Sequence, residues 1–175
     1  MRWIFTLFLS FFMVGCSTLE VNVDYDEGFD FAKVKSFKVM HNVQEGESTL
    51  VNDRITKAIE SELEQKGYVK ATKDVDLVFV YHYNAKDKVD IRTDYQMVGY
   101  GSFGYGGAMV ARTNTYNYTE GTIIIDALNP KTKKIVWRSV GTLELQEKET
   151  PQEKREYVNK IIKEMLEKYP KKSLS

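Results

Sequence analysis

Apolar and polar residues alternate with a period of two along five stretches of the chain. That alternation is typical of strands that bury one face. In the longest stretch, Val78 and Val80 make the second face apolar as well, so we predict that this strand lies inside a sheet. We expect strands at residues 19–25, 36–41, 74–91, 114–128 and 135–146.

Two further stretches repeat their apolar residues at helical spacing. The first predicted helix runs from residue 48 or 49 to 66 and ends before Gly67, a residue suited to a left-handed stop. The second begins after Thr150, an N-cap that is followed by Pro151 and by Glu153, which completes a capping box. Both helices have one apolar face and are therefore predicted to pack on the sheet.

The order of these elements is strand, strand, helix, three long strands and helix. Strands joined as hairpins, with the helices segregated from them, indicate the α+β class. We predict an antiparallel β-sheet of about five strands with two helices packed on one face. The other face is then left to water, a membrane or a partner.

A short basic start and an apolar run open the chain. Arg2 is followed by apolar residues at 3–13, a length within the range of a secretory signal. The run is shorter than the roughly 20 apolar residues of a membrane-spanning helix. It leads to Met13-Val14-Gly15-Cys16, which contains the only cysteine of the chain. This stretch resembles the signal of a bacterial lipoprotein.

That resemblance implies that the chain is cut after Gly15 and that Cys16 receives acyl chains such as palmitate. Each buried methylene contributes about 0.8 kcal/mol, so several chains give a stable anchor where one chain does not. Ser17 after the cysteine favours the outer membrane, facing the periplasm. Two alternatives are a core cysteine that follows an ordinary signal and a membrane anchor that is never cut.

The composition fits one folded domain behind this anchor. Hydrophobic residues make up 42% and charged residues 29% of the chain, as in globular proteins. The 25 basic and 25 acidic side chains cancel, which argues against nucleic acid as a partner. The membrane, through the acyl chains, and an envelope protein are the expected partners. We expect a signal peptide at 1–15, a lipidated cysteine and linker at 16–19, a single domain at 20–170 and a tail at 171–175.

Short motifs recur in order over most of the domain. The most specific are Tyr118-Thr119-Glu120-Gly121-Thr122 and Val136-Trp137-Arg138, with further matches at 21–25, 53–68, 76–82 and 169–170. Together they are similar to a bacterial family of envelope lipoproteins catalogued as a domain of unknown function. The family implies a lipid-anchored α+β domain. It implies no reaction, so no catalytic residue is carried over.

Glycines and aromatic residues are interleaved between residues 97 and 111. Gly99-Tyr100-Gly101-Ser102-Phe103-Gly104 matches the dinucleotide-binding pattern, but that pattern requires a helix after it, and no helical stripe follows. We interpret the stretch as a hairpin arm. Its rings Tyr100, Phe103 and Tyr105 are candidate contact residues for a protein partner, peptidoglycan or the membrane.

The sequence predicts no cofactor and no metal site. Its two histidines, His41 and His82, lie on separate predicted strands, without a cysteine or a second histidine at ligand spacing. We therefore expect a non-enzymatic binding or structural module. Alternatives are an accessory subunit of an outer-membrane assembly and a carrier of a small ligand or lipid. A cleft that brings His82, Glu120 and Asp126 together would instead indicate a hydrolase.

Overall fold

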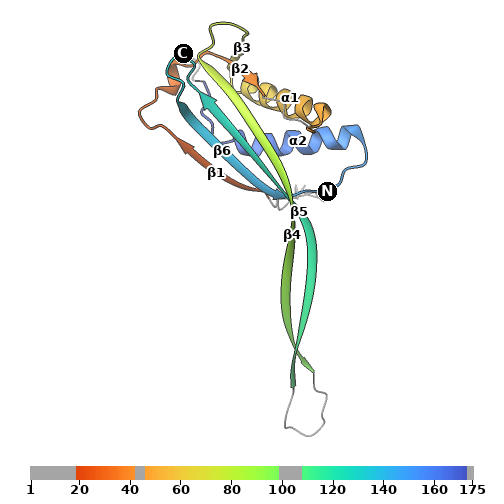
Figure 1. Cartoon of the computed structure of the whole chain (residues 1–175). Helices are drawn as coiled ribbons and strands as arrows, with labels where there is room; N and C mark the ends of the chain where they lie inside the picture. The colour runs from red at the N-terminus through yellow and green to blue at the C-terminus, as the bar shows by residue number, and fades with distance from the viewer. Residues whose placement is uncertain (1–18, 42–45, 99–107, 173–175) are drawn as a thin grey trace, which may run out of the picture.

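A computed structural model of the chain describes residues 19–41, 46–98 and 108–172 (Figure 1). These residues form a six-stranded sheet, one short 3-10 helix and two α-helices, which confirms the α+β class. The elements in chain order are β1 (Glu20–Tyr25), η1 (Phe31–Lys33), β2 (Ser36–Met40), α1 (Thr49–Gln65), β3 (Val69–Lys70), β4 (Leu77–Val98), β5 (Ala108–Leu128), β6 (Ile135–Glu144) and α2 (Pro151–Leu166).

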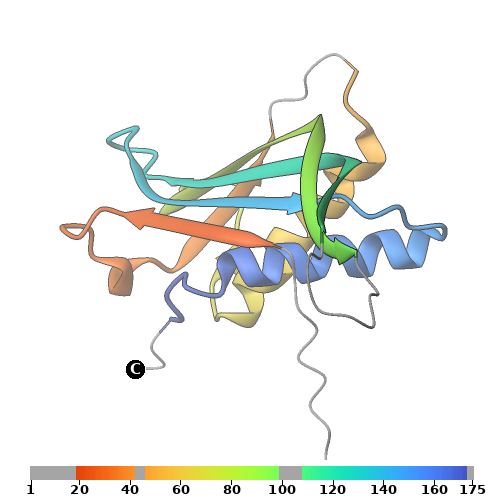
Figure 2. The same ribbon diagram turned by 90° about the horizontal axis from the view of Figure 1, so that it is seen from below.

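The sheet is mixed, and both helices cover the same face of it (Figure 2). The strand order is β1-β6-β5-β4-β2-β3. The pairs β1–β6, β6–β5 and β5–β4 are antiparallel, but β2 runs parallel to β4 and to β3. The prediction of a wholly antiparallel sheet is therefore wrong for its β2 side. The chain crosses from β2 to β4 through α1, and a helical crossover returns the chain in the same direction.

Both helices begin and end much as the sequence predicts. Gly67 follows α1 with a φ of +92°, the left-handed conformation that glycine adopts at low cost. At the start of α2, the Thr150 side chain accepts a hydrogen bond from the Glu153 N–H, and the Glu153 carboxylate accepts one from the Thr150 N–H. The predicted capping box is thus present, with Pro151 in the first turn. No helix in the described residues is both long and apolar enough to cross a membrane.

The core lies between the sheet and the two helices. Its centre is Tyr169, just beyond α2, whose ring packs edge-on against Trp137 of β6 at 5.1 Å and Phe79 of β4 at 5.3 Å. The ring of Phe31, in η1, lies 5.9 Å from the Tyr169 ring. Burial raises the pKa of the Tyr169 hydroxyl far above its ordinary value. Trp137 is 1% exposed, which places it in the core.

The hairpin of β4 and β5 is longer than the sequence predicts. We expected these strands at 74–91 and 114–128, but they extend to Val98 and start from Ala108. Their register is unbroken from Val78 opposite Leu128 to Val98 opposite Ala108. The added segments contain Val, Thr and Tyr, which favour extended structure.

Candidate interaction surface

Beyond the sheet, β4 and β5 continue as a two-stranded ribbon. The register of β5 with β6 stops at Glu120 opposite Glu144, and that of β4 with β2 stops at Val80. We call residues 87–98 and 108–119 the arm. In the described part of the chain, the arm strands pair with each other, and the backbone bond of Leu145 to Thr119 at the base is their one further strand-like contact. At about 3.3 Å per residue the arm is about 40 Å long, and it projects well clear of both layers (Figure 1).

The arm exposes a strand edge that continues from the edge paired with β6. The Leu145 N–H donates to the Thr119 carbonyl at 2.8 Å, so the backbone groups of Thr119 point toward the β6 side. Because these groups alternate in direction along a strand, those of Thr113, Thr115 and Asn117 point to the same side. Residues 113–117 are exposed and uncharged. An exposed strand edge without charge is a template for pairing with another chain.

One side-chain hydrogen bond joins the base of the arm to β6, and further contacts lie within the arm itself. The Tyr116 hydroxyl donates to Glu144 Oε1 at 2.7 Å, and the Thr119 hydroxyl donates to Asp87 Oδ1 at 2.8 Å. The ring of Tyr118 stacks beside that of Tyr116, with the centroids 6.2 Å apart. The direction in which the arm leaves the sheet is therefore set by specific side chains and not by backbone pairing alone.

The first strand begins at the same end of the sheet as the arm. Glu20, at the start of β1, lies opposite Thr142, which in turn lies opposite Thr122. Thr122 is only two residues from Glu120, where the arm leaves the sheet. Strand β1 therefore runs away from the arm, and its first residue, Glu20, lies at the arm end of the sheet.

The sheet face opposite the helices carries one strong ion pair. Arg138 Nε donates to Asp126 Oδ1 at 2.6 Å, and Arg138 Nη2 donates to Asp126 Oδ2 at 2.7 Å. Asp126 is only 6% exposed, although it lies on the uncovered face, because its neighbours shield it. The hydrogen bond to Asp126 raises the pKa of the Arg138 guanidinium. Such a bidentate pair leaves the carboxylate little freedom to act as an acid or a base.

The three residues considered for a hydrolase do not converge. His82 lies opposite Ile124 and is exposed, and Glu120 forms an ion pair with Lys88 at 3.4 Å. Glu120 and Asp126 are six residues apart on one strand, which separates them by about 20 Å. No group of three or more metal-ligating side chains is found in the described ranges.

A polar cluster that the sequence did not predict lies where β2 meets the start of α1. His41 Nε2 lies 2.6 Å from Glu47 Oε2, and His41 Nδ1 lies 3.0 Å from the Tyr81 carbonyl oxygen. The imidazole also stacks on the Tyr81 ring at 4.3 Å. The Tyr81 hydroxyl in turn donates to the Asn52 carbonyl at 2.9 Å. Both ring nitrogens of His41 are engaged, so we interpret the cluster as a structural connection between the layers.

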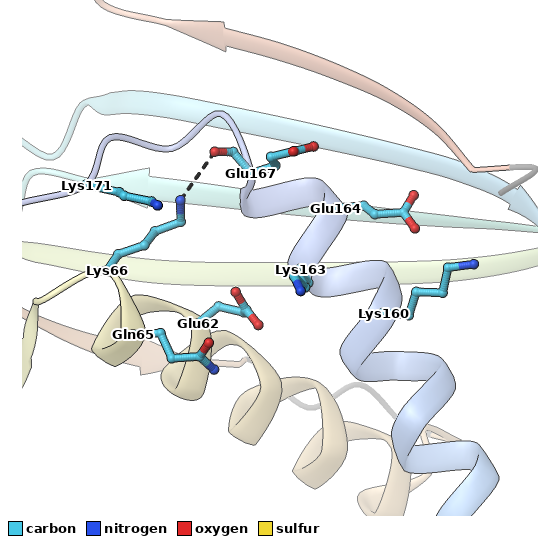
Figure 3. Close-up of a pocket in the computed structure, with 8 residues that line it drawn as sticks. All are labelled: Glu62, Gln65, Lys66, Lys160, Lys163, Glu164, Glu167 and Lys171. Atoms are coloured by element: carbon cyan, nitrogen blue, oxygen red, sulfur yellow. Dashed lines mark hydrogen bonds between the residues drawn. The ribbon is translucent and has the colours of Figure 1, made fainter. Parts of the chain in front are cut away.

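An open groove separates the ends of the two helices (Figure 3). Lys66 lies at its inner end, where Nζ donates to the carbonyls of Tyr169 at 3.0 Å and Glu167 at 3.3 Å. Burial, and next the nearby Lys171 ammonium, lower the pKa of Lys66. All of the lining is polar or charged, unlike the apolar cavity of a lipid carrier: Glu62, Gln65, Lys66, Lys160, Lys163, Glu164, Glu167 and Lys171.

Several residues named from the sequence lie outside the described ranges. They include Gly15 and Cys16 of the expected lipid-attachment site, and the rings Tyr100, Phe103 and Tyr105. The structure nevertheless describes the strands that flank those rings as far as Val98 and from Ala108. The contacts of His41 and of Lys66 had no periodic signal in the sequence, because each joins segments that only the tertiary fold brings together.

These features define a two-layer α+β domain with a projecting β-hairpin. The chain belongs to the family described as domain of unknown function DUF4136, whose model matches residues 21–171. The prediction that the chain belongs to a family catalogued as a domain of unknown function is therefore confirmed. No curated protein sequence matches the chain.

Solved structures share the fold at low sequence identity. A PDZ domain protein from Parabacteroides distasonis is 17% identical, with a TM-score of 0.54. The match covers 89% of this chain and 36% of the PDZ domain protein, so this chain spans about a third of the length of that protein. The PelC dodecamer from Paraburkholderia phytofirmans is 10% identical with a TM-score of 0.53, and the match covers 89% of this chain and 99% of that one. A minor lipoprotein from Acinetobacter baumannii is 10% identical over 77% of this chain and 87% of that one, with a TM-score of 0.38, too low to indicate a common fold.

Proposed function

We propose that this chain is a lipid-anchored, non-enzymatic protein of the bacterial cell envelope that acts as a binding or structural module close to the membrane. The single observation that carries the proposal is the arm. An isolated two-stranded hairpin is at best marginally stable in water, and its open edges invite pairing. The arm contains twelve cross-strand pairs, from Asp87–Thr119 to Val98–Ala108, and they lie outside the core. The simplest role for such a segment is contact with something outside the domain.

The lipid anchor is supported by the Met13-Val14-Gly15-Cys16 motif and by the position of β1. Only residues 17–19 separate Cys16 from Glu20, the first residue of that strand. Four residue steps span at most about 14 Å. An acylated Cys16 would therefore keep the domain close to the outer membrane, on its periplasmic side.

A second candidate is an accessory subunit of an outer-membrane assembly. The observation that favours it is the match to a protein solved as a dodecamer, which includes 99% of that chain. The exposed edge at Thr113, Thr115 and Asn117 offers a surface for such an assembly. The carrier alternative is not favoured, because the groove beside Lys66 has a charged lining.

Two measurements test the proposal. Radiolabelled palmitate is expected to label the wild-type protein and not the Cys16→Ala variant, and equal labelling of both contradicts the anchor. In-cell photo-crosslinking from a reactive residue at Asn117, on the exposed edge, is expected to give a discrete product. The matched control is Lys57, an exposed residue of α1. A product pattern that is the same from both positions contradicts a specific contact through the arm.

A further inference from the structure

The distal end of the arm differs in charge from the rest of it. Asp94 lies opposite Arg112, and beyond this pair the register runs from Tyr95 opposite Ala111 to Val98 opposite Ala108. The sequence contains no charged residue between Asp94 and Arg112. Nearer the sheet, by contrast, charged residues recur along the β4 side of the arm at Asp87, Lys88, Asp90 and Arg92.

The arm and the first residue of β1 lie at the same end of the sheet. Glu20 lies at the arm end, and the three residues between it and Cys16 can span at most about 14 Å. The arm extends about 40 Å from that end. The arm is much longer than the linker. If Cys16 is attached to a bilayer, the arm therefore reaches that bilayer unless it lies at a shallow angle along the surface.

We infer that the uncharged distal end of the arm, residues 95–98 and 108–111, lies in the headgroup region of the bilayer that holds the lipid anchor. The inference rests on the proposed acylation of Cys16. Uncharged and aromatic residues suit this depth, where amphipathic rings gather and apolar groups gain by leaving water. The arm is thus a second attachment point, which fixes the orientation of the domain on the membrane.

The open edges of the arm limit its depth. Each backbone N–H or carbonyl left without a partner in the hydrocarbon core costs several kcal/mol, and lipid-exposed strand edges do not occur there. The headgroup region contains water and polar groups that satisfy such edges. The absence of charge also makes the contact independent of anionic lipid, so its strength is expected to resist high salt.

Depth-dependent quenching on vesicles tests the inference with the full-length acylated protein. Because Cys16 is the only cysteine and would be acylated, a single introduced cysteine takes a fluorophore specifically. We compare Val98→Cys, in the distal arm, with Leu50→Cys, which replaces an exposed residue of α1. The vesicles contain phosphatidylethanolamine, phosphatidylglycerol and a lipid with a nitroxide near the headgroup. Quenching of the Val98 label is expected to be several-fold stronger.

Two outcomes separate the inference from the proposed anchor. If the protein floats with the vesicles but both labels are quenched equally, the inference is overturned and the anchor stands. If the protein does not float, the anchor fails, and the inference falls with it.

A charge placed in the distal arm supplies the second test. With the label on Ala108→Cys, Val98→Glu is expected to reduce quenching to the level at Leu50, whereas Thr115→Glu nearer the sheet leaves it strong. Strong quenching that survives Val98→Glu overturns the inference.

Discussion

The two halves of β4 have the same conformation and very different surroundings. From Val78 to Val80, the strand lies between β2 and β5. Its side chains Leu77, Phe79 and Tyr81 lie in the core and are at most 1% exposed. From Asp87 onward it has only β5 beside it, and Val89 is 63% exposed. Cross-strand pairing alone therefore does not reveal where stability resides. Burial distinguishes a half that holds the domain together from a half that is free to contact something else.

The largest expected effect falls on the covered half of the sheet. Trp137→Ala removes a ring that is 1% exposed and packs on Tyr169, so we expect a loss of about 3–5 kcal/mol in the free energy of unfolding. Urea denaturation followed by circular dichroism measures it. A loss below about 1 kcal/mol would contradict the assignment of this ring to the core.

The ion pair on the uncovered face is expected to matter less. Asp126→Ala leaves the Arg138 guanidinium without its bidentate partner, at an expected cost of about 1–3 kcal/mol. The matched control is Asp53→Ala, which breaks an exposed pair with Lys57 and should cost no more than about 0.5 kcal/mol. Equal costs in the two variants would show that the uncovered face gives Asp126 no special environment.

A pH-dependent effect is expected where β2 meets β4. Burial alone would raise the pKa of Asp76, but hydrogen bonds from Lys35 N–H, Ser36 N–H and the Ser36 hydroxyl outweigh it and lower that pKa. The folded state therefore binds the Asp76 proton less readily than the unfolded state. This contribution is present above the ordinary pKa of 3.8 and is lost as the pH falls through the lowered value.

Asp76→Asn checks this assignment. The stability difference between wild type and variant, measured by urea denaturation from pH 6 downward, is expected to shrink as the solution becomes more acid. A difference that stays constant across that range would mean that the charge of Asp76 does not matter.

The smallest effect is expected in the arm. Val89→Ala should change the unfolding free energy by less than about 0.5 kcal/mol, because the side chain is 63% exposed. Val136→Ala is the matched control, since this valine is 3% exposed and its truncation should cost about 1–3 kcal/mol. Similar losses at the two positions would show that the arm is part of the cooperative unit after all.

Local patterns in the sequence predict most of the layered domain. Helix α2 was predictable because Thr150, Pro151 and Glu153 act within one turn. The parallel pairing of β2 was not, because periodicity reports which face of a strand is buried and says nothing of its neighbours. The length of the arm was underestimated although Val89, Ile91, Tyr95 and Met97 alternate with polar residues along β4, because the glycines that follow from Gly99 favoured a loop. The bonds of Lys66 to the carbonyls of Glu167 and Tyr169 join residues about a hundred positions apart, beyond any window of local pattern.

The place of Tyr169 at the centre of the core also bears on the order of events in the cell. Its ring touches Phe31, Phe79 and Trp137, so segments made early meet one made late. During synthesis the chain cannot close its core until residue 169 has been added, and contacts of such long sequence separation form slowly. A chain that remains open until then is still suited to threading through a secretion channel. Under the proposed export of this chain, folding would follow on the far side of the membrane.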